Sequence, residues 1–221
     1  MERRPLAVRG TKWANSLAKF LAHINLSPNK ISILSVLFSI LALICFTYAS
    51  IYKYLLLFAA LAIQLRLICN LLDGMVAIEY NKKSIYGNLY NDIPDRFADV
   101  FIIMGAGIYS FQSESQHLTT QLIITLAWIN SILAVMTAYI RVLGTSLCTP
   151  TNFSGIMAKP QRMALLTISS ILAFLISFKS NFPIIALALI LMFIGQSITV
   201  FSRIKFIVHH LKLNESTGSK K

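Results

Sequence analysis

Charged residues are scarce in this chain of 221 residues. They make up 13% of the sequence, whereas 56% is hydrophobic, and a water-soluble globular chain usually carries about a quarter charged residues. The apolar residues form long blocks rather than an alternating pattern, and the mean hydropathy is +0.69. Such a chain is solvated by lipid rather than by water. Its length allows one compact helical domain.

Cysteine and acidic residues are also few. Cys45, Cys69 and Cys148 lie in or beside apolar segments without the spacing of metal ligands, so they predict no disulfide framework and are interpreted as small apolar residues. Eight acidic residues stand against 20 lysines and arginines, a formal charge of +12. In a membrane protein this excess indicates basic cytoplasmic loops beside anionic lipid headgroups, so no nucleic acid partner is expected.

The long apolar blocks predict transmembrane helices. Most approach the roughly 20 residues that a helix needs to cross a bilayer, and the fifth is shorter. The predicted spans are 31–50, 54–77, 88–111, 120–143, 163–178 and 182–206. Short connections make neighbouring helices antiparallel. The fold class expected is all-α, a polytopic membrane helical bundle of about six transmembrane helices.

Two flanking segments complete the predicted organisation. Residues 1–27 form a juxtamembrane amphipathic helix, 28–206 the six-helix membrane domain and 207–221 a cytoplasmic tail. Apolar residues recur at helical spacing in the first segment: Trp13, Leu17, Phe20, Leu21 and Ile24. This stripe is typical of a helix lying in the membrane interface. A helix packed against the bundle would show the same stripe, and both interpretations stay open.

The distribution of lysine and arginine predicts the orientation. Basic residues concentrate in the N-terminal segment, the C-terminus and the loops 78–87 and 144–161, whereas only Lys53 and Lys179 lie on the opposite side. The positive-inside rule therefore places both termini and these loops in the cytoplasm. No organelle-targeting segment is recognisable, which fits a multi-pass protein of a bacterial inner membrane.

Polar residues inside the predicted membrane domain are concentrated in the segment 70–99. Five of the eight acidic residues lie between Asp73 and Asp99. An ionised group at this depth costs roughly 3 kcal/mol on insertion scales, so it usually faces a cavity and has a function. Helical spacing groups these side chains on two faces: Arg66, Asn70, Asp73 and Ala77 on one, and Asn91, Asp95 and Asp99 on the other. A turn near Gly87 makes the two helices antiparallel.

The opposed faces predict a set of carboxylate and amide oxygens facing the cytoplasm. Such oxygens suit Mg²⁺, Mn²⁺ or Ca²⁺ better than zinc or copper. Asp92 lies close to the second face. Asn91 or Asp92 could also cap the helix, with Pro94 in its first turn. Capping alone does not account for Asp73 and Asp99.

The spacing of these residues resembles the signature of the CDP-alcohol phosphotransferases, also called CDP-alcohol phosphatidyltransferases. That signature is Asp, two residues, Asp-Gly, two residues, Ala-Arg, about eight residues, Gly, three residues, Asp, three residues, Asp. The matching positions here are Asn70, Asp73-Gly74, Ala77-Ile78, Gly87, Asn91 and Asp95. The segment 28–32 also resembles the entry to the family's first span.

The resemblance implies an integral membrane enzyme of phospholipid synthesis. It would transfer a phosphatidyl-type group from a CDP-linked lipid, such as CDP-diacylglycerol, to an alcohol acceptor and release CMP. The implied cofactor is one or two ions of Mg²⁺ or Mn²⁺, held by Asn70, Asp73, Asn91, Asp92 and Asp95. Asp95 is the implied catalytic base. The implied substrate-binding residues are Asn29, Gly74, Ala77, Gly87, Arg141 and Lys159. A homodimer in contact with membrane lipids is a further implication.

The sequence departs from the signature at three positions. Asn70 and Asn91 replace aspartates, and Ile78 replaces the arginine. An asparagine still offers a carbonyl oxygen to a metal but carries no charge. Metal binding is therefore expected to weaken unless Asp92, Asp99 or Glu79 compensates, and Asp92 is best placed to do so.

Other functions and other roles remain compatible with the sequence. A degenerate family member would bind nucleotide or lipid without turnover. A small membrane transporter would place polar groups along a path through both leaflets, whereas here the acidic residues stop in the cytoplasmic half. Arg66 could form a structural ion pair with Asp73 or Asp99. Arg141 could extend to the membrane surface, and Lys159 and Arg162 could serve only to set topology.

Overall fold

The architecture is a bundle of long helices. A computed structural model describes residues 7–82, 85–113, 117–176 and 183–218, and over these ranges it consists of helices and turns. A short 3₁₀ helix, η1 (Ala7–Gly10), comes first. The α-helices are α1 (Lys12–His23), α2 (Pro28–Tyr48), α3 (Leu55–Glu79), α4 (Gly87–Ser113), α5 (His117–Ser146), α6 (Lys159–Ile176) and α7 (Ile184–Gly218).

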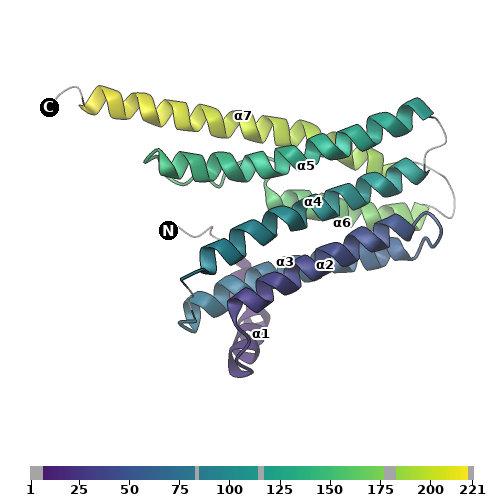
Figure 1. Ribbon diagram of the computed structural model, residues 1–221, viewed down its shortest axis with the longest axis horizontal. Helices are drawn as coiled ribbons and strands as arrows, with labels where there is room; N and C mark the ends of the chain where they lie inside the picture. The colour runs from purple at the N-terminus through teal and green to yellow at the C-terminus, as the bar shows by residue number, and fades with distance from the viewer. Residues whose placement is uncertain (1–6, 83–84, 114–116, 177–182, 219–221) are drawn as a thin grey trace.

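Helices α2 to α7 run side by side and alternate in direction (Figure 1). Each predicted span overlaps one of them, so the expected membrane bundle is confirmed. By length and hydropathy, α2, α3, α5 and α7 qualify as membrane-crossing helices in the described part of the chain. The other two, α4 and α6, contribute charged residues to the interior of the bundle, including Asp99 and Arg162.

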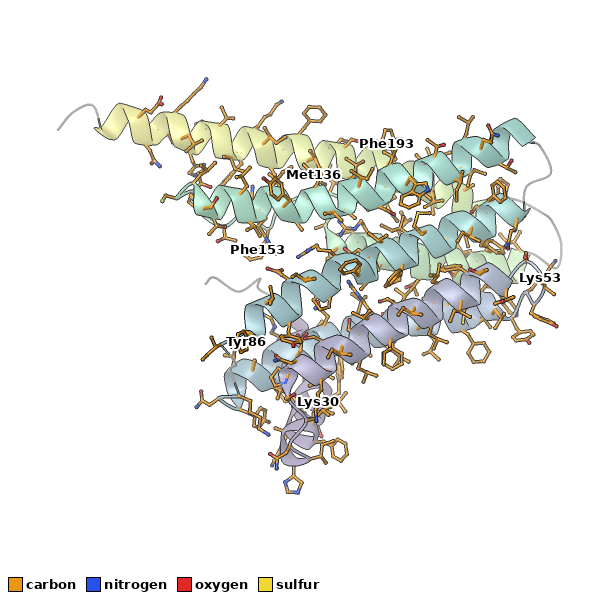
Figure 2. The ribbon with its side chains drawn as sticks, viewed as in Figure 1. Lys30, Lys53, Tyr86, Met136, Phe153 and Phe193 are labelled. Atoms are coloured by element: carbon orange, nitrogen blue, oxygen red, sulfur yellow. The ribbon has the colours of Figure 1, made fainter. Side chains whose placement is uncertain are left out.

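The two ends of the bundle separate basic residues that the sequence assigns to opposite sides of the membrane (Figure 2). Lys30 and Tyr86 lie at one end and Lys53 at the other (Figure 2). The first end holds the start of α2, the end of α3 and the start of α4. We refer to it below as the motif end. The assignment of the motif end to the cytoplasmic side is a prediction from the basic residues.

Helix α1 lies across the bundle at the motif end instead of along it (Figure 1). Ala14 and Ala18 are fully buried there and pack with residues of α3 such as Met75. The larger side chains face outward, with Trp13 48% and Phe20 58% exposed. Most of the predicted apolar stripe therefore does not pack against the bundle, and its position in a membrane interface stays a prediction. The alanine face of α1 packs on the bundle, and its aromatic face is available to a membrane interface.

Small residues allow the helices of the bundle to approach closely. A Cβ added to Gly105 of α4 would lie 2.9 Å from the Leu43 Cα of α2, and one added to Gly107 would lie 2.3 Å from the Ala127 Cβ of α5. Because lipid tails are as apolar as the helix surfaces, close packing of this kind drives helix association in membranes. The effect here is to hold α4 firmly between α2 and α5.

Candidate active site

Asp99 is the centre of a buried ion-pair network. Its Oδ1 lies 2.6 Å from an Arg66 nitrogen and its Oδ2 lies 2.6 Å from an Arg162 nitrogen. The three side chains come from α4, α3 and α6 and are at most 2% exposed. The predicted pairing of Arg66 with Asp99 is confirmed. Arg162 has a structural contact that the sequence did not reveal, because its partner lies 63 positions away.

Asp95, one turn before Asp99 on α4, belongs to a second cluster of polar side chains. Its Oδ2 accepts a hydrogen bond of 2.5 Å from Lys159 Nζ, and its Oδ1 accepts one of 3.0 Å from Asn70 Nδ2. Arg66 approaches the same Oδ1 at 3.4 Å. Lys159 is the first residue of α6, so the cluster joins α3, α4 and α6 at the motif end.

The amide of Asn70 links the members of this cluster. Its Oδ1 accepts a hydrogen bond from Lys159 Nζ at 2.8 Å. Its Nδ2 donates to Asp95 and, at 3.5 Å, to Asn91 Oδ1. The structure therefore brings together Asn70, Asn91, Asp95 and Lys159, as the opposed helix faces predicted for the first three. We call these four residues the motif cluster.

Asp73 is buried with only part of its hydrogen-bonding capacity used. Its side chain lies one turn after Asn70 on α3 and is 3% exposed. Ser32 Oγ of α2 donates to its Oδ2 at 2.7 Å, whereas its Oδ1 has no partner among the described groups. A buried carboxylate oxygen without a partner is costly. This arrangement indicates a position for a cation or a hydrogen-bond donor that binds with the substrate.

Asp92 occupies a separate and more exposed position. Its Oδ1 lies 2.9 Å from an Arg96 nitrogen and 3.4 Å from an Arg141 nitrogen, and its side chain is 41% exposed. The Arg141 guanidinium also lies 5.4 Å from the centre of the Phe153 ring. Phe153 is placed below the end of α5 in Figure 2. These contacts engage Asp92 with arginines, and its role as a compensating metal ligand stays a prediction.

The remaining predicted substrate-binding residues lie near the same end. Asn29 is half-buried in the first turn of α2, three residues before Ser32. Gly74 follows Asp73, and Ala77 lies one turn further along α3; both are half-buried. Gly87 begins α4, and a Cβ added there would meet nothing within 4 Å. The space beside Gly87 is therefore open to a ligand. No described neighbouring atom would clash with a Cβ at this position, so close packing does not require glycine here.

The residues present fit one divalent cation better than two. Among the described residues, no group of three or more His, Cys, Asp or Glu side chains is placed to hold a metal ion. The unpartnered Asp73 Oδ1 is the oxygen best suited to a hard cation. The Asp95 carboxylate, by contrast, is already compensated by Lys159 and Arg66. A site of this charge does not match two ions of total charge +4.

Comparisons with known proteins agree with this geometry. The family model for CDP-alcohol phosphatidyltransferase matches residues 25–201, which include every residue of the motif cluster. No curated protein matches the chain in sequence.

The fold is similar to that of the Mycobacterium tuberculosis phosphatidylinositol phosphate synthase PgsA1. The crystal structure of that enzyme with CDP-DAG bound superimposes with a TM-score of 0.71 at 18% identity, covering 89% of this chain and 94% of that one. The structure in complex with manganese and citrate gives 0.71 at 18% identity, with 88% of each chain covered. The apo form gives 0.67 at 17% identity, covering 87% and 94%. At this level of identity the likeness establishes the fold.

The matched family model covers most of the chain, and the motif cluster lies within it. The chain is a multi-pass membrane protein and belongs to the CDP-alcohol phosphatidyltransferase family, whose reaction is phosphatidyl transfer from a CDP-linked lipid in phospholipid synthesis.

Proposed function

We propose that this chain transfers the phosphatidyl group of CDP-diacylglycerol to an anionic alcohol and releases CMP, with Asp95 as the base. The observation that carries the proposal is the position of Asp95 in the last motif aspartate's place, with both carboxylate oxygens held by Asn70 and Lys159. A carboxylate fixed at the motif end can meet a soluble acceptor and a lipid headgroup together.

The proposed step is a single displacement at phosphorus. The acceptor hydroxyl attacks the phosphatidyl phosphorus, its proton passes to Asp95, and the bond from that phosphorus to the CMP oxygen breaks. CMP leaves with the bonding electron pair. Asp95 then returns the proton to water at the motif end. Lys159 and Arg66, both next to Asp95, supply positive charge where the phosphate oxygens would lie.

Asp73 is the proposed principal ligand of a Mg²⁺ or Mn²⁺ ion, with Asn91 and Asp95 on the facing helix as further oxygen donors. When bound, such an ion would neutralise negative charge on the diphosphate. Ser32 fixes the orientation of the Asp73 carboxylate through its 2.7 Å hydrogen bond. This contact leaves the Asp73 Oδ1 for the ion or for a donor on the substrate.

An anionic acceptor is supported by the arginines near the site. Arg141 and Arg203 line a small surface recess between α5, the loop 149–152 and α7. Arg203 is oriented by its hydrogen bond of 3.0 Å to the Ser154 carbonyl. Guanidinium groups bind phosphate and carboxylate through charge-assisted hydrogen bonds. The positive charge of Arg141 and Arg203 therefore favours a phosphorylated alcohol over a neutral one.

The cell location proposed is a bacterial inner membrane with both termini and the site in the cytoplasm. Basic residues at the motif end support it, including Lys30, Lys82 and Lys159. A nucleotide-linked donor and a charged acceptor would reach the site from that side. The homodimer that the family resemblance implies is retained as a prediction.

The second candidate is a family member that binds CDP-linked lipid without turnover. The substitutions Asn70 and Asn91 favour it, because they remove two of the four motif carboxylates. Purified protein with Mn²⁺, CDP-diacylglycerol and a panel of phosphorylated and neutral alcohols separates the two. The enzyme releases CMP with at least one acceptor, and Asp95→Asn does not. Binding of the donor without CMP release across the panel would instead establish the second candidate.

A further inference from the structure

A lysine of this chain contacts the side chains at both motif positions 70 and 95. In the family signature, positions 70 and 95 are both aspartates, and carboxylates opposed at hydrogen-bond distance repel each other unless a cation lies between them. Here the Lys159 ammonium lies 2.8 Å from Asn70 Oδ1 and 2.5 Å from Asp95 Oδ2. A lysine nitrogen therefore uses the oxygens of both positions.

The asparagine at position 70 is suited to this internal cation. Its carbonyl oxygen faces Lys159, and its amide nitrogen faces Asp95 Oδ1 at 3.0 Å. The amide thus replaces a carboxylate pair by a hydrogen bond, and it contributes no charge that would need a second positive group. Asn91 extends the same pattern, because its Oδ1 accepts from the other hydrogen of that amide.

Two of the buried carboxylates, Asp95 and Asp99, have cationic partners within the chain. Three carboxylates lie buried in this part of the structure, Asp73, Asp95 and Asp99. Three cations accompany them, Arg66, Lys159 and Arg162. Asp99 is paired with two guanidinium groups, and the charge of Asp95 is offset by Lys159 and Arg66. Only Asp73 lacks a cationic contact among the described ion pairs, which leaves one place for a divalent ion.

We propose that the Lys159 ammonium takes the place of one of two divalent cations, so that the chain assembles its site without metal and binds at most one ion. This inference rests on the proposed function for its location, because it concerns the same site. The lysine would serve two roles that a metal ion would have at this position. It holds the facing helices together, and it presents positive charge to the diphosphate through its remaining N–H.

The test counts Mn²⁺ ions in purified protein by electron paramagnetic resonance, without any substrate. We expect the parent chain to bind at most one Mn²⁺ and to keep its melting temperature in EDTA. The double variant Asn70→Asp/Lys159→Met restores the signature carboxylate and removes the ammonium, and it should bind one Mn²⁺ more than the parent. The matched control Lys82→Met removes a lysine that bonds the Ala22 carbonyl and Asn25, and it should leave the count unchanged.

Two Mn²⁺ ions in the parent, or no additional ion in a folded double variant, would overturn the inference. If the double variant does not fold, Lys159→Met and Lys159→Arg decide. Mn²⁺ should raise the melting temperature of Lys159→Met by several degrees more than that of Lys159→Arg, and equal responses would again overturn it. Because these readouts do not require turnover, a chain that releases no CMP but gains an ion in the double variant would refute the proposed activity alone.

Discussion

Asp95 and Asp99 lie one turn apart on α4, yet their surroundings differ in kind. Asp99 forms ion pairs with two guanidinium groups from α3 and α6 and is 1% exposed. Asp95 is 11% exposed and is held by a lysine and an amide as well as by a more distant guanidinium. A guanidinium pair is rigid, whereas a lysine stem and an amide can rotate. The first environment locks helices together, and the second leaves a carboxylate able to exchange partners.

Two carboxylates one helix turn apart therefore have different proposed roles: Asp99 stabilises the fold, and Asp95 takes part in the reaction. Burial alone does not distinguish the proposed base from its neighbour, because both carboxylates are buried. Two other features distinguish Asp95: its partners are a lysine and an amide, and it lies near Asp73, whose Oδ1 has no hydrogen-bond partner among the described groups. The substitutions below test that distinction.

The strongest test of the comparison is Asp95→Asn. The introduced amide is nearly isosteric but cannot accept the acceptor's proton, so CMP release should fall by about 10²- to 10⁴-fold, the usual contribution of a general base. The melting temperature should fall less than in Asp99→Asn, because the amide oxygen can still accept the hydrogen bond from Lys159. The rate is measured as CMP formed from CDP-diacylglycerol.

The control for this loss is Glu215→Gln, an exposed acid near the end of α7. It should leave the rate unchanged. A rate for Asp95→Asn within threefold of the parent would show that Asp95 is not the base.

Asp99→Asn should lower the free energy of unfolding, whereas Asp95→Asn mainly lowers the rate of CMP release. It leaves the buried Arg66 and Arg162 without a full counter-charge, and breaking a buried pair by removing one partner typically costs about 3–5 kcal/mol. The measurement is the free energy of unfolding in mixed detergent micelles.

Asp92→Asn is the matched comparison for Asp99→Asn, because Asp92 also pairs with two arginines but is 41% exposed. Solvent screening should reduce its cost to about 0–1 kcal/mol. Similar costs at the two positions would refute the distinction drawn here between a buried and an exposed pair. The same Asp92 variant also tests the compensation hypothesis, which requires weaker Mn²⁺ binding.

The sequence predicted the helices and the shared faces because both depend on local information. Hydropathy and the 3.6-residue period place Asn70 with Asp73 and Asn91 with Asp95 without any knowledge of the tertiary fold. The partners of these residues lie much further away in the chain: 89 positions separate Lys159 from Asn70, and 41 separate Ser32 from Asp73. Contacts at such distances depend on how the helices pack, and no spacing rule encodes them.

Ser32→Ala should weaken the metal position without unfolding the bundle. It removes the hydrogen bond that orients the Asp73 carboxylate, and loss of a group that orients a metal ligand typically lowers metal affinity or activity about 10- to 100-fold. The concentration of Mn²⁺ that supports half-maximal CMP release should rise accordingly. Ser39→Ala is the control, because Ser39 is also buried in α2 but, among the described hydrogen bonds, its hydroxyl donates to the Ser35 carbonyl of its own helix.

The smallest expected effect concerns the acceptor. Arg141→Gln removes one cation from the recess beside α5, and an exposed charged contact is worth about 1 kcal/mol, so KM for a phosphorylated acceptor should rise about fivefold with kcat unchanged. Arg96→Gln shares the Asp92 partner but does not line the recess, and it should leave KM unchanged. Because the proposed contact between Arg141 and the acceptor depends on charge, KM for a neutral alcohol should not change in Arg141→Gln. An equal rise in KM for neutral and phosphorylated acceptors would indicate that Arg141 supports the loop through Phe153 and does not bind the acceptor.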